Sequence, residues 1–140
     1  MGGNGWHQTG PYLPDLAAAF RRAQDEELAR DDHGFTGLTI DQLWRDEDWH
    51  EYVFTGGTGT VLDQVRLVDP THPGDGPSMR PLTPAEITPW CPTGRPTLAE
   101  WLDAMHTDAL PWPDRAAGHC VILHRGGAPD AVGYWGITAD

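Results

Sequence analysis

Apolar residues recur at helical spacing between Leu13 and Leu28, while charged residues occupy the other face. This pattern predicts a helix that begins near residues 12–14, where a proline suits the first turn, and that is ended by residues 31–37. Capping boxes predict three more helices, because a threonine and a glutamine or glutamate three residues later can bond each other's backbone amides. The boxes begin at Thr39, Thr83 and Thr97, and their helices are predicted to end near residues 49–52, 90 and 105.

Short apolar runs bounded by turn residues predict the strands. Residues 60–69 are predicted to form one strand. Residues 120–124 and 131–138 are predicted to pair as an antiparallel hairpin, because residues 125–130 between them carry Gly-Gly and Pro turn chemistry.

The rest of the chain reads as irregular, with loops predicted over residues 1–11 and 70–81. The whole chain, residues 1–140, is predicted to be a single α+β domain. Its helices are expected to pack on one face of a small antiparallel sheet that includes the C-terminal hairpin.

Composition narrows the functional classes. The chain has no lysine, which excludes Schiff-base enzymes, serine–lysine hydrolases and lysine-containing phosphate loops. Its net charge of −12 argues against nucleic acid or an anionic membrane as partner, and suits a basic protein partner. The start lacks the basic and apolar segments of a signal peptide, and no stretch is long enough for a membrane span. We therefore expect a cytoplasmic protein with reduced thiols.

Histidine and cysteine raise the possibility of metal binding or nucleophilic catalysis, and their spacing supports neither. His119, Cys120 and His124 lie close in sequence, but neighbours on a strand point to opposite faces, so His119 and Cys120 are not expected to converge. No zinc-type spacing occurs. Cys120 is predicted to be buried in an apolar strand, whereas Cys91 is predicted to be more accessible in a loop. We predict no catalytic residue, no metal and no cofactor.

The glycine-rich run from Gly56 to Gly59 could bind an anion through its backbone amides. It precedes a predicted strand rather than a helix and has no lysine, so it is predicted to be a structural loop.

Carboxylates and aromatic residues alternate along the second predicted helix. This composition is typical of a surface that binds a basic partner, with aromatic anchors and a charged rim. A solvated acidic helix face is the plainer interpretation, and a divalent cation or an acid–base pair is a third. The candidate binding residues are Trp44, Asp46, Asp48, Trp49, Glu51 and Tyr52. We expect alanine at Trp49, with charge reversal at Asp46 and Asp48, to weaken partner binding without unfolding the chain.

An aromatic pocket between the sheet and the helices is the alternative prediction, for a small-molecule-binding protein or a small enzyme. A cavity lined by tryptophan with converging polar groups would favour it, and a packed interior with exposed aromatic residues would favour protein binding. The candidate lining residues are His50, Arg80, Trp90, Trp101, His106, Trp112 and Trp135.

Three stretches together resemble a family of small, uncharacterised bacterial proteins of actinobacterial type. They are YLPDLAAAF at residues 12–20, GTGTVLD at residues 57–63, and the closing hairpin from Cys120 to Gly136. The resemblance covers under half of the chain and agrees with the predicted organisation. It implies no activity, cofactor or site residue.

The functional prediction is therefore a small acidic protein that acts by binding a basic protein partner, as a regulator or as an immunity-type antagonist of a toxin. It depends on the small size, the acidity, the alternation of tryptophan with carboxylates and the lack of a catalytic arrangement.

Overall fold

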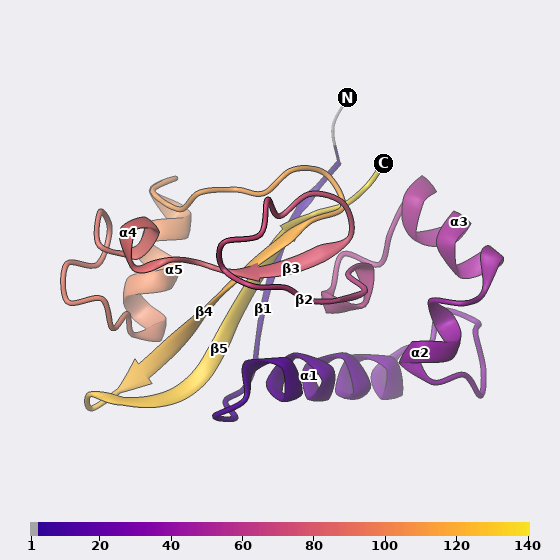
Figure 1. The fold of residues 1–140 in the computed structure, drawn as a ribbon, viewed down its shortest axis with the longest axis horizontal. Helices are drawn as coiled ribbons and strands as arrows, with labels where there is room; N and C mark the ends of the chain where they lie inside the picture. The colour runs from indigo at the N-terminus through magenta and orange to yellow at the C-terminus, as the bar shows by residue number, and fades with distance from the viewer. Residues whose placement is uncertain (1–2) are drawn as a thin grey trace.

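One five-stranded sheet organises the chain in the computed structural model, which describes residues 3–140 (Figure 1). The strands in spatial order are β1 (Gly5–Pro11), β5 (Ala128–Ile137), β4 (Gly118–Arg125), β3 (Ser78–Pro81) and β2 (Arg66–Leu67). β5 pairs antiparallel with β1 and β4, whereas β3 pairs in parallel with β4 and β2. The α+β class and the closing hairpin are confirmed. The prediction of an antiparallel sheet is wrong, because the sheet is mixed.

Helices cover both faces of this sheet, which corrects the expectation that they cover one. Phe20 and neighbouring alanines of α1 (Leu16–Arg30) pack against Cys120 and Tyr134 on one face. Trp101 of α5 (Leu98–His106) packs against Trp135 on the other, and Figure 1 shows the two helices on opposite sides of the strands. The two apolar sets alternate along β4 and β5, as the pleat requires.

Two strands lie where loops were predicted. β1 takes up Gly5–Pro11 within the predicted loop at residues 1–11, and β3 lies inside residues 70–81. In β1, Trp6 is the one large apolar residue, and the partner strand β5 comes from the far end of the chain. β3 has only four residues, so neither strand has the apolar run that predicts one.

All three capping boxes are confirmed, and they begin α2 (Ile40–Leu43), α4 (Pro84–Ile87) and α5. The second predicted helix is divided, because α2 stops and α3 (Glu47–Thr55) begins after a new cap. The carboxylate of Asp46 accepts a hydrogen bond from the backbone N–H of Asp48 at 2.8 Å, which sets the start of α3.

The strand predicted over residues 60–69 is mostly wrong. A short 3-10 helix, η1 (Val61–Asp63), takes its first part, and only β2 remains as strand. The buried amide of Gln24 donates to the carbonyl oxygens of Val61 and Gln64 at 3.2 and 2.7 Å, and Gln8 accepts from the N–H of Val61 at 3.0 Å. Side chains from α1 and β1 thus bind backbone groups that a sheet ladder would otherwise pair.

Gly133 of β5 is required by the close approach of the Trp101 indole. A Cβ at this position would lie 2.8–3.0 Å from three ring carbons, which cannot move as a flexible chain end can. We expect Gly133→Ala to lower the free energy of unfolding by about 1–3 kcal/mol, measured by urea denaturation. In a Trp101→Phe background, where the smaller ring leaves room for the new methyl group, Gly133→Ala should lower the free energy of unfolding by measurably less than in the wild-type protein. Additive effects of the two substitutions in this double-mutant cycle would contradict the explanation.

Candidate functional site

An aromatic cluster forms a small core of its own beside the end of α1. Trp49 lies at its centre, with ring centroids 5.1 Å from Phe35, 6.1 Å from Trp44 and 5.9 Å from Tyr52. The Phe35 and Trp44 contacts are edge-to-face, which is a favourable geometry for aromatic pairs. Together with Leu62 and its apolar neighbours, this cluster attaches α2 and α3 to the rest of the fold.

Trp49 was predicted to contact a partner, and its position corrects that expectation. Its side chain is 0% exposed, so it supports α3 from below rather than forming part of a surface. Trp44 is half-buried, and Tyr52 is 37% exposed, with its hydroxyl 3.0 Å from Nδ1 of His33. We therefore expect alanine at Trp49 to disturb the fold, contrary to the prediction from sequence.

The acidic residues of the predicted surface have two kinds of role. Asp46 caps α3, while Glu47 and Asp48 lie in its first turn, where negative charge complements the helix dipole. Glu51 is exposed and lies beyond the first turn, so helix stability does not account for it.

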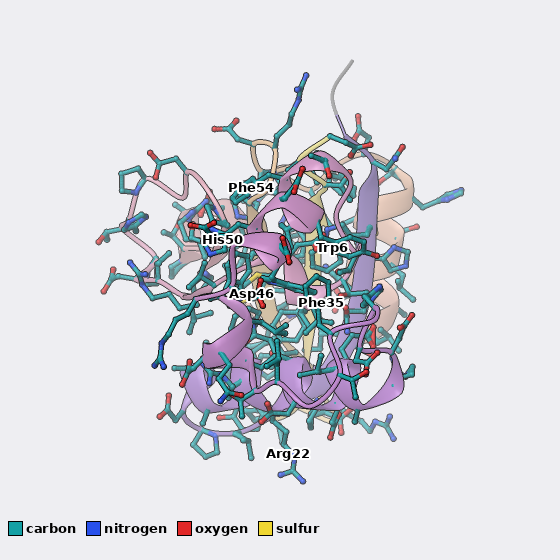
Figure 2. All side chains as sticks on the ribbon, turned by 90° about the vertical axis from the view of Figure 1, so that its right-hand side faces the viewer. Trp6, Arg22, Phe35, Asp46, His50 and Phe54 are labelled. Atoms are coloured by element: carbon teal, nitrogen blue, oxygen red, sulfur yellow. The ribbon has the colours of Figure 1, made fainter. Side chains whose placement is uncertain are left out.

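The outer face of α3 carries Glu47, His50, Glu51 and Phe54. Phe54 is 42% exposed, and Figure 2 shows it and His50 on the same side of α3. The His50 ring is fixed at its other side, where Nε2 lies 2.7 Å from the carbonyl oxygen of Trp44. Phe54 was not among the predicted binding residues, although its one-turn spacing from His50 could have indicated it.

Negative charge is concentrated around this helix. Residues 25–51 hold ten of the 21 carboxylates of the chain and two of its nine arginines. Every charged side chain of α3 is a carboxylate. The outer face of α3 therefore belongs to a segment of the chain with a large excess of carboxylates over arginines.

The seven residues of the alternative pocket do not line one cavity. Trp101 and Trp135 are packed in the core under α5, and Nε1 of Trp135 donates to the carbonyl oxygen of Pro111 at 2.9 Å. His50 lies on α3, while His106 and Trp112 are exposed. A cavity of about 330 Å³ does lie beside β4, but none of the seven residues lines it.

Arg80 and Trp90 belong instead to a polar cluster around Glu86. Arg80 donates to both carboxylate oxygens of Glu86, at 2.8 and 2.9 Å, and Nε1 of Trp90 donates to the Glu86 carbonyl at 2.9 Å. The hydrogen bonds and charge of Arg80 lower the pKa of Glu86 from 4.5 to about 2. This two-point pair fixes β3 to α4.

His119, which the sequence analysis considered only for metal binding and catalysis, is buried beside this pair. It is 5% exposed, its ring lies 5.6 Å from that of Trp135, and its Nδ1 has no hydrogen-bond partner among the described residues. Burial, with the nearby charge of Arg80, lowers the pKa of His119 from 6.5 to about 4. The imidazole is therefore neutral in the folded protein at neutral pH.

The two thiols are both buried. Cys120 packs under α1 while His119 lies on the α5 side, so the prediction that they point to opposite faces is confirmed. Burial raises the pKa of the Cys120 thiol to about 12, which leaves little of the nucleophilic thiolate. Cys91 is 0% exposed, so the expectation of an accessible thiol is wrong. Across residues 3–140, no three His, Cys, Asp or Glu side chains are grouped to hold a metal ion.

The backbone amides of the glycine-rich loop bind a carboxylate of the protein itself, the side chain of Asp63. The carboxylate of Asp63 accepts from the backbone N–H groups of Thr58 and Gly59 at 2.7 and 3.0 Å, and from the Thr58 hydroxyl at 2.8 Å. Burial raises the pKa of Asp63 in spite of these donors. The loop is thus structural, as predicted, because its amides are already used.

Comparison with known proteins adds no assignment: no family model, curated protein or solved structure matches the chain. Within residues 3–140, no helix combines the length and the apolar character needed to cross a membrane.

Proposed function

We propose that this protein is a binding module that recognises a basic partner protein through the outer face of α3. The observation that carries the proposal is the exposure of Phe54 and Glu51 on a helix whose charged side chains are all carboxylates. An exposed aromatic ring with a rim of one charge is the composition expected of an interface anchor. A regulator or an immunity-type antagonist of a toxin would act in this way.

The buried aromatic cluster supports this role, because it holds α3 in one position. Edge-to-face contacts around Trp49 leave the helix little freedom to rotate, so its outer side chains are preorganised. Phe54 takes the part of aromatic anchor that the sequence had suggested for Trp49.

The charge distribution supports a basic partner in particular. The excess of carboxylates over residues 25–51 would attract a cationic surface over a long range and repel an acidic one. Binding should weaken as salt is added, because ions screen such attraction.

Capture from a lysate of the native host tests the proposal with two matched variants. Glu51→Arg with Phe54→Ala changes the proposed surface, and Asp103→Arg with Leu102→Ala makes the same chemical change on α5, where Leu102 is 39% exposed. We expect the wild-type protein and the α5 variant to retain one basic polypeptide that salt elutes. The α3 variant should bind it at least about tenfold more weakly, a loss of about 1.4 kcal/mol.

Equal retention of the same polypeptide by the two variants would contradict the proposed surface. Capture of no polypeptide, or of an acidic one that salt does not elute, would contradict the proposed function. Circular dichroism of both variants checks that the fold is unchanged.

A further inference from the structure

A cavity lies where the free edge of β4 is left uncovered. β3 stops pairing after Pro81, and the N–H of Leu82 makes the last bond on this edge, to the carbonyl oxygen of Cys120 at 2.9 Å. Further along, the N–H of His124 donates to the carbonyl oxygen of Pro96 at 2.8 Å. Between these bonds the edge faces a cavity of about 330 Å³ at Ile122, which is within the range of small-ligand sites.

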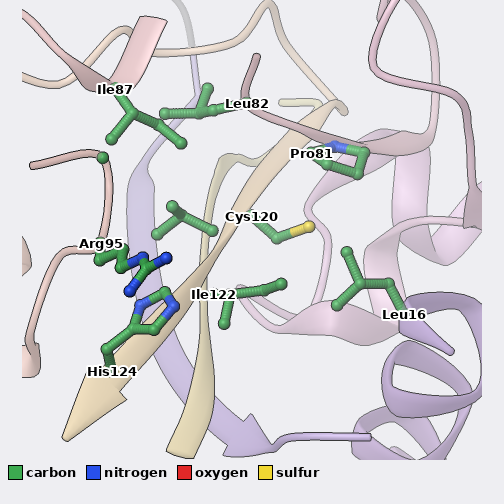
Figure 3. A pocket seen from close by; sticks show the side chains of 10 residues that line it. Leu16, Pro81, Leu82, Ile87, Arg95, Cys120, Ile122 and His124 are labelled. Atoms are coloured by element: carbon green, nitrogen blue, oxygen red, sulfur yellow. The ribbon is translucent and has the colours of Figure 1, made fainter. Parts of the chain in front are cut away.

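The lining of this cavity is apolar over most of its length. Its apolar side chains come from the first turn of α1, from β4 and from the chain around α4, and they are Leu16, Pro81, Leu82, Ile87, Val121 and Ile122. Figure 3 shows Leu16 and Pro81 together at one end, with Ile122 between them and the opposite end. An apolar ligand body would replace water along this surface, which favours binding.

The opposite end of the cavity is polar and cationic. Figure 3 shows the guanidinium of Arg95 beside the ring of His124, and both residues line the cavity. Arg95 makes no ion pair with the residues of the described chain. The guanidinium of Arg95 is therefore free to pair with an anionic ligand group at this end of the cavity.

We propose that this cavity binds a small carboxylic acid with an aliphatic body. The carboxylate would pair with Arg95 beside the His124 ring, and the aliphatic chain would extend past Ile122 toward Leu16. The protein has a net charge of −12, so most of its surface repels anions. The positive charge of Arg95 at one end of the cavity gives an anionic ligand a local partner there.

The closed ends of the edge argue for a small molecule rather than an added peptide strand. The bonds at Cys120 and His124 occupy the edge on either side of Ile122, which leaves a gap of one residue on that edge. A peptide strand needs several consecutive residues to pair. None of the residues that line the cavity lies on α3, so this proposal does not depend on whether a partner protein binds α3.

Calorimetric titration of the full chain with sodium octanoate at low salt tests the proposal. We expect one octanoate per chain, with octan-1-ol and sodium acetate each at least about tenfold weaker, because each lacks one of the two required parts. Arg95→Gln should weaken octanoate about tenfold or more, and Arg115→Gln, at an exposed arginine outside the cavity, should not.

Nuclear magnetic resonance locates the site in the same samples. Octanoate should shift the ring signals of His124 and the methyl signals of Ile122. Octanol binding as tightly as octanoate, equal affinity of the Arg95 and Arg115 variants, shifts confined to other residues, or no binding at millimolar octanoate would each overturn the proposal.

Discussion

Replacing Trp49 with alanine should lower the free energy of unfolding by about 3–5 kcal/mol. The indole is 0% exposed and contacts the rings of Phe35, Trp44 and Tyr52, so its removal leaves a cavity that these rings cannot fill without moving. A loss of this size is a large part of the stability of a typical domain. Urea denaturation monitored by near-ultraviolet circular dichroism measures it.

Two variants serve as controls for this prediction. Phe54→Ala removes an aromatic ring from the exposed side of the same helix and should change stability by no more than about 0.5 kcal/mol. Trp49→Phe keeps a ring in the cluster and removes a buried Nε1 that has no partner among the described residues, so it should cost less than alanine. A cost for Trp49→Ala as small as that of Phe54→Ala would show that the cluster does not hold α3.

Lowering the pH from 6.5 to 4 should remove about 3 kcal/mol of stability through His119 alone. The unfolded chain takes up a proton at this histidine near its ordinary pKa of 6.5, whereas burial and the Arg80 charge hold the folded pKa at about 4. The unfolded state therefore binds more protons in this window. The contribution of His119 is fully present above pH 6.5 and is lost as the pH falls toward 4.

Neighbouring charges set the window for this measurement. Glu86 and Asp114 raise the pKa of His119 and so oppose the larger effects of burial and Arg80. The Arg80–Glu86 pair loses its own stabilisation only as the pH falls from 4.5 toward about 2. The interval between pH 6.5 and 5 therefore lies above the range in which this pair loses its stabilisation, and the buried Asp63 carboxyl, whose pKa is raised, acts in the opposite direction to His119.

Urea denaturation across this interval gives the slope of stability against pH. We expect His119→Gln to flatten the slope and His106→Gln, at an exposed histidine on α5, to retain it. If His119→Gln does not fold, magnetic resonance of the wild-type ring gives the same answer. Titration of His119 near pH 6.5 would contradict the prediction.

Local sequence signals predicted the parts of the fold that depend on near neighbours. The capping boxes at Thr39, Thr83 and Thr97 involve residues three apart, and the closing hairpin pairs segments joined by a short turn. These elements are confirmed for that reason.

Elements set by distant residues were missed. β1 pairs with the opposite end of the chain, and the segment after Thr60 is held by Gln24 and Gln8 rather than by a ladder. The alternation of carboxylates with aromatic residues predicted a binding surface with Trp49 as an anchor, whereas Trp49 is buried in an aromatic cluster. It could not show which rings face inward, because the new cap at Asp46 sets the rotation of the helix.

Hydrogen–deuterium exchange of the captured complex against the free protein tests the central claim, that α3 is the binding surface. Slower exchange over α3 and its cap, with α5 and the hairpin unchanged, is the result predicted by exposed Phe54 and Glu51. Slower exchange at the β1 edge or over α5, with α3 unchanged, would contradict the account.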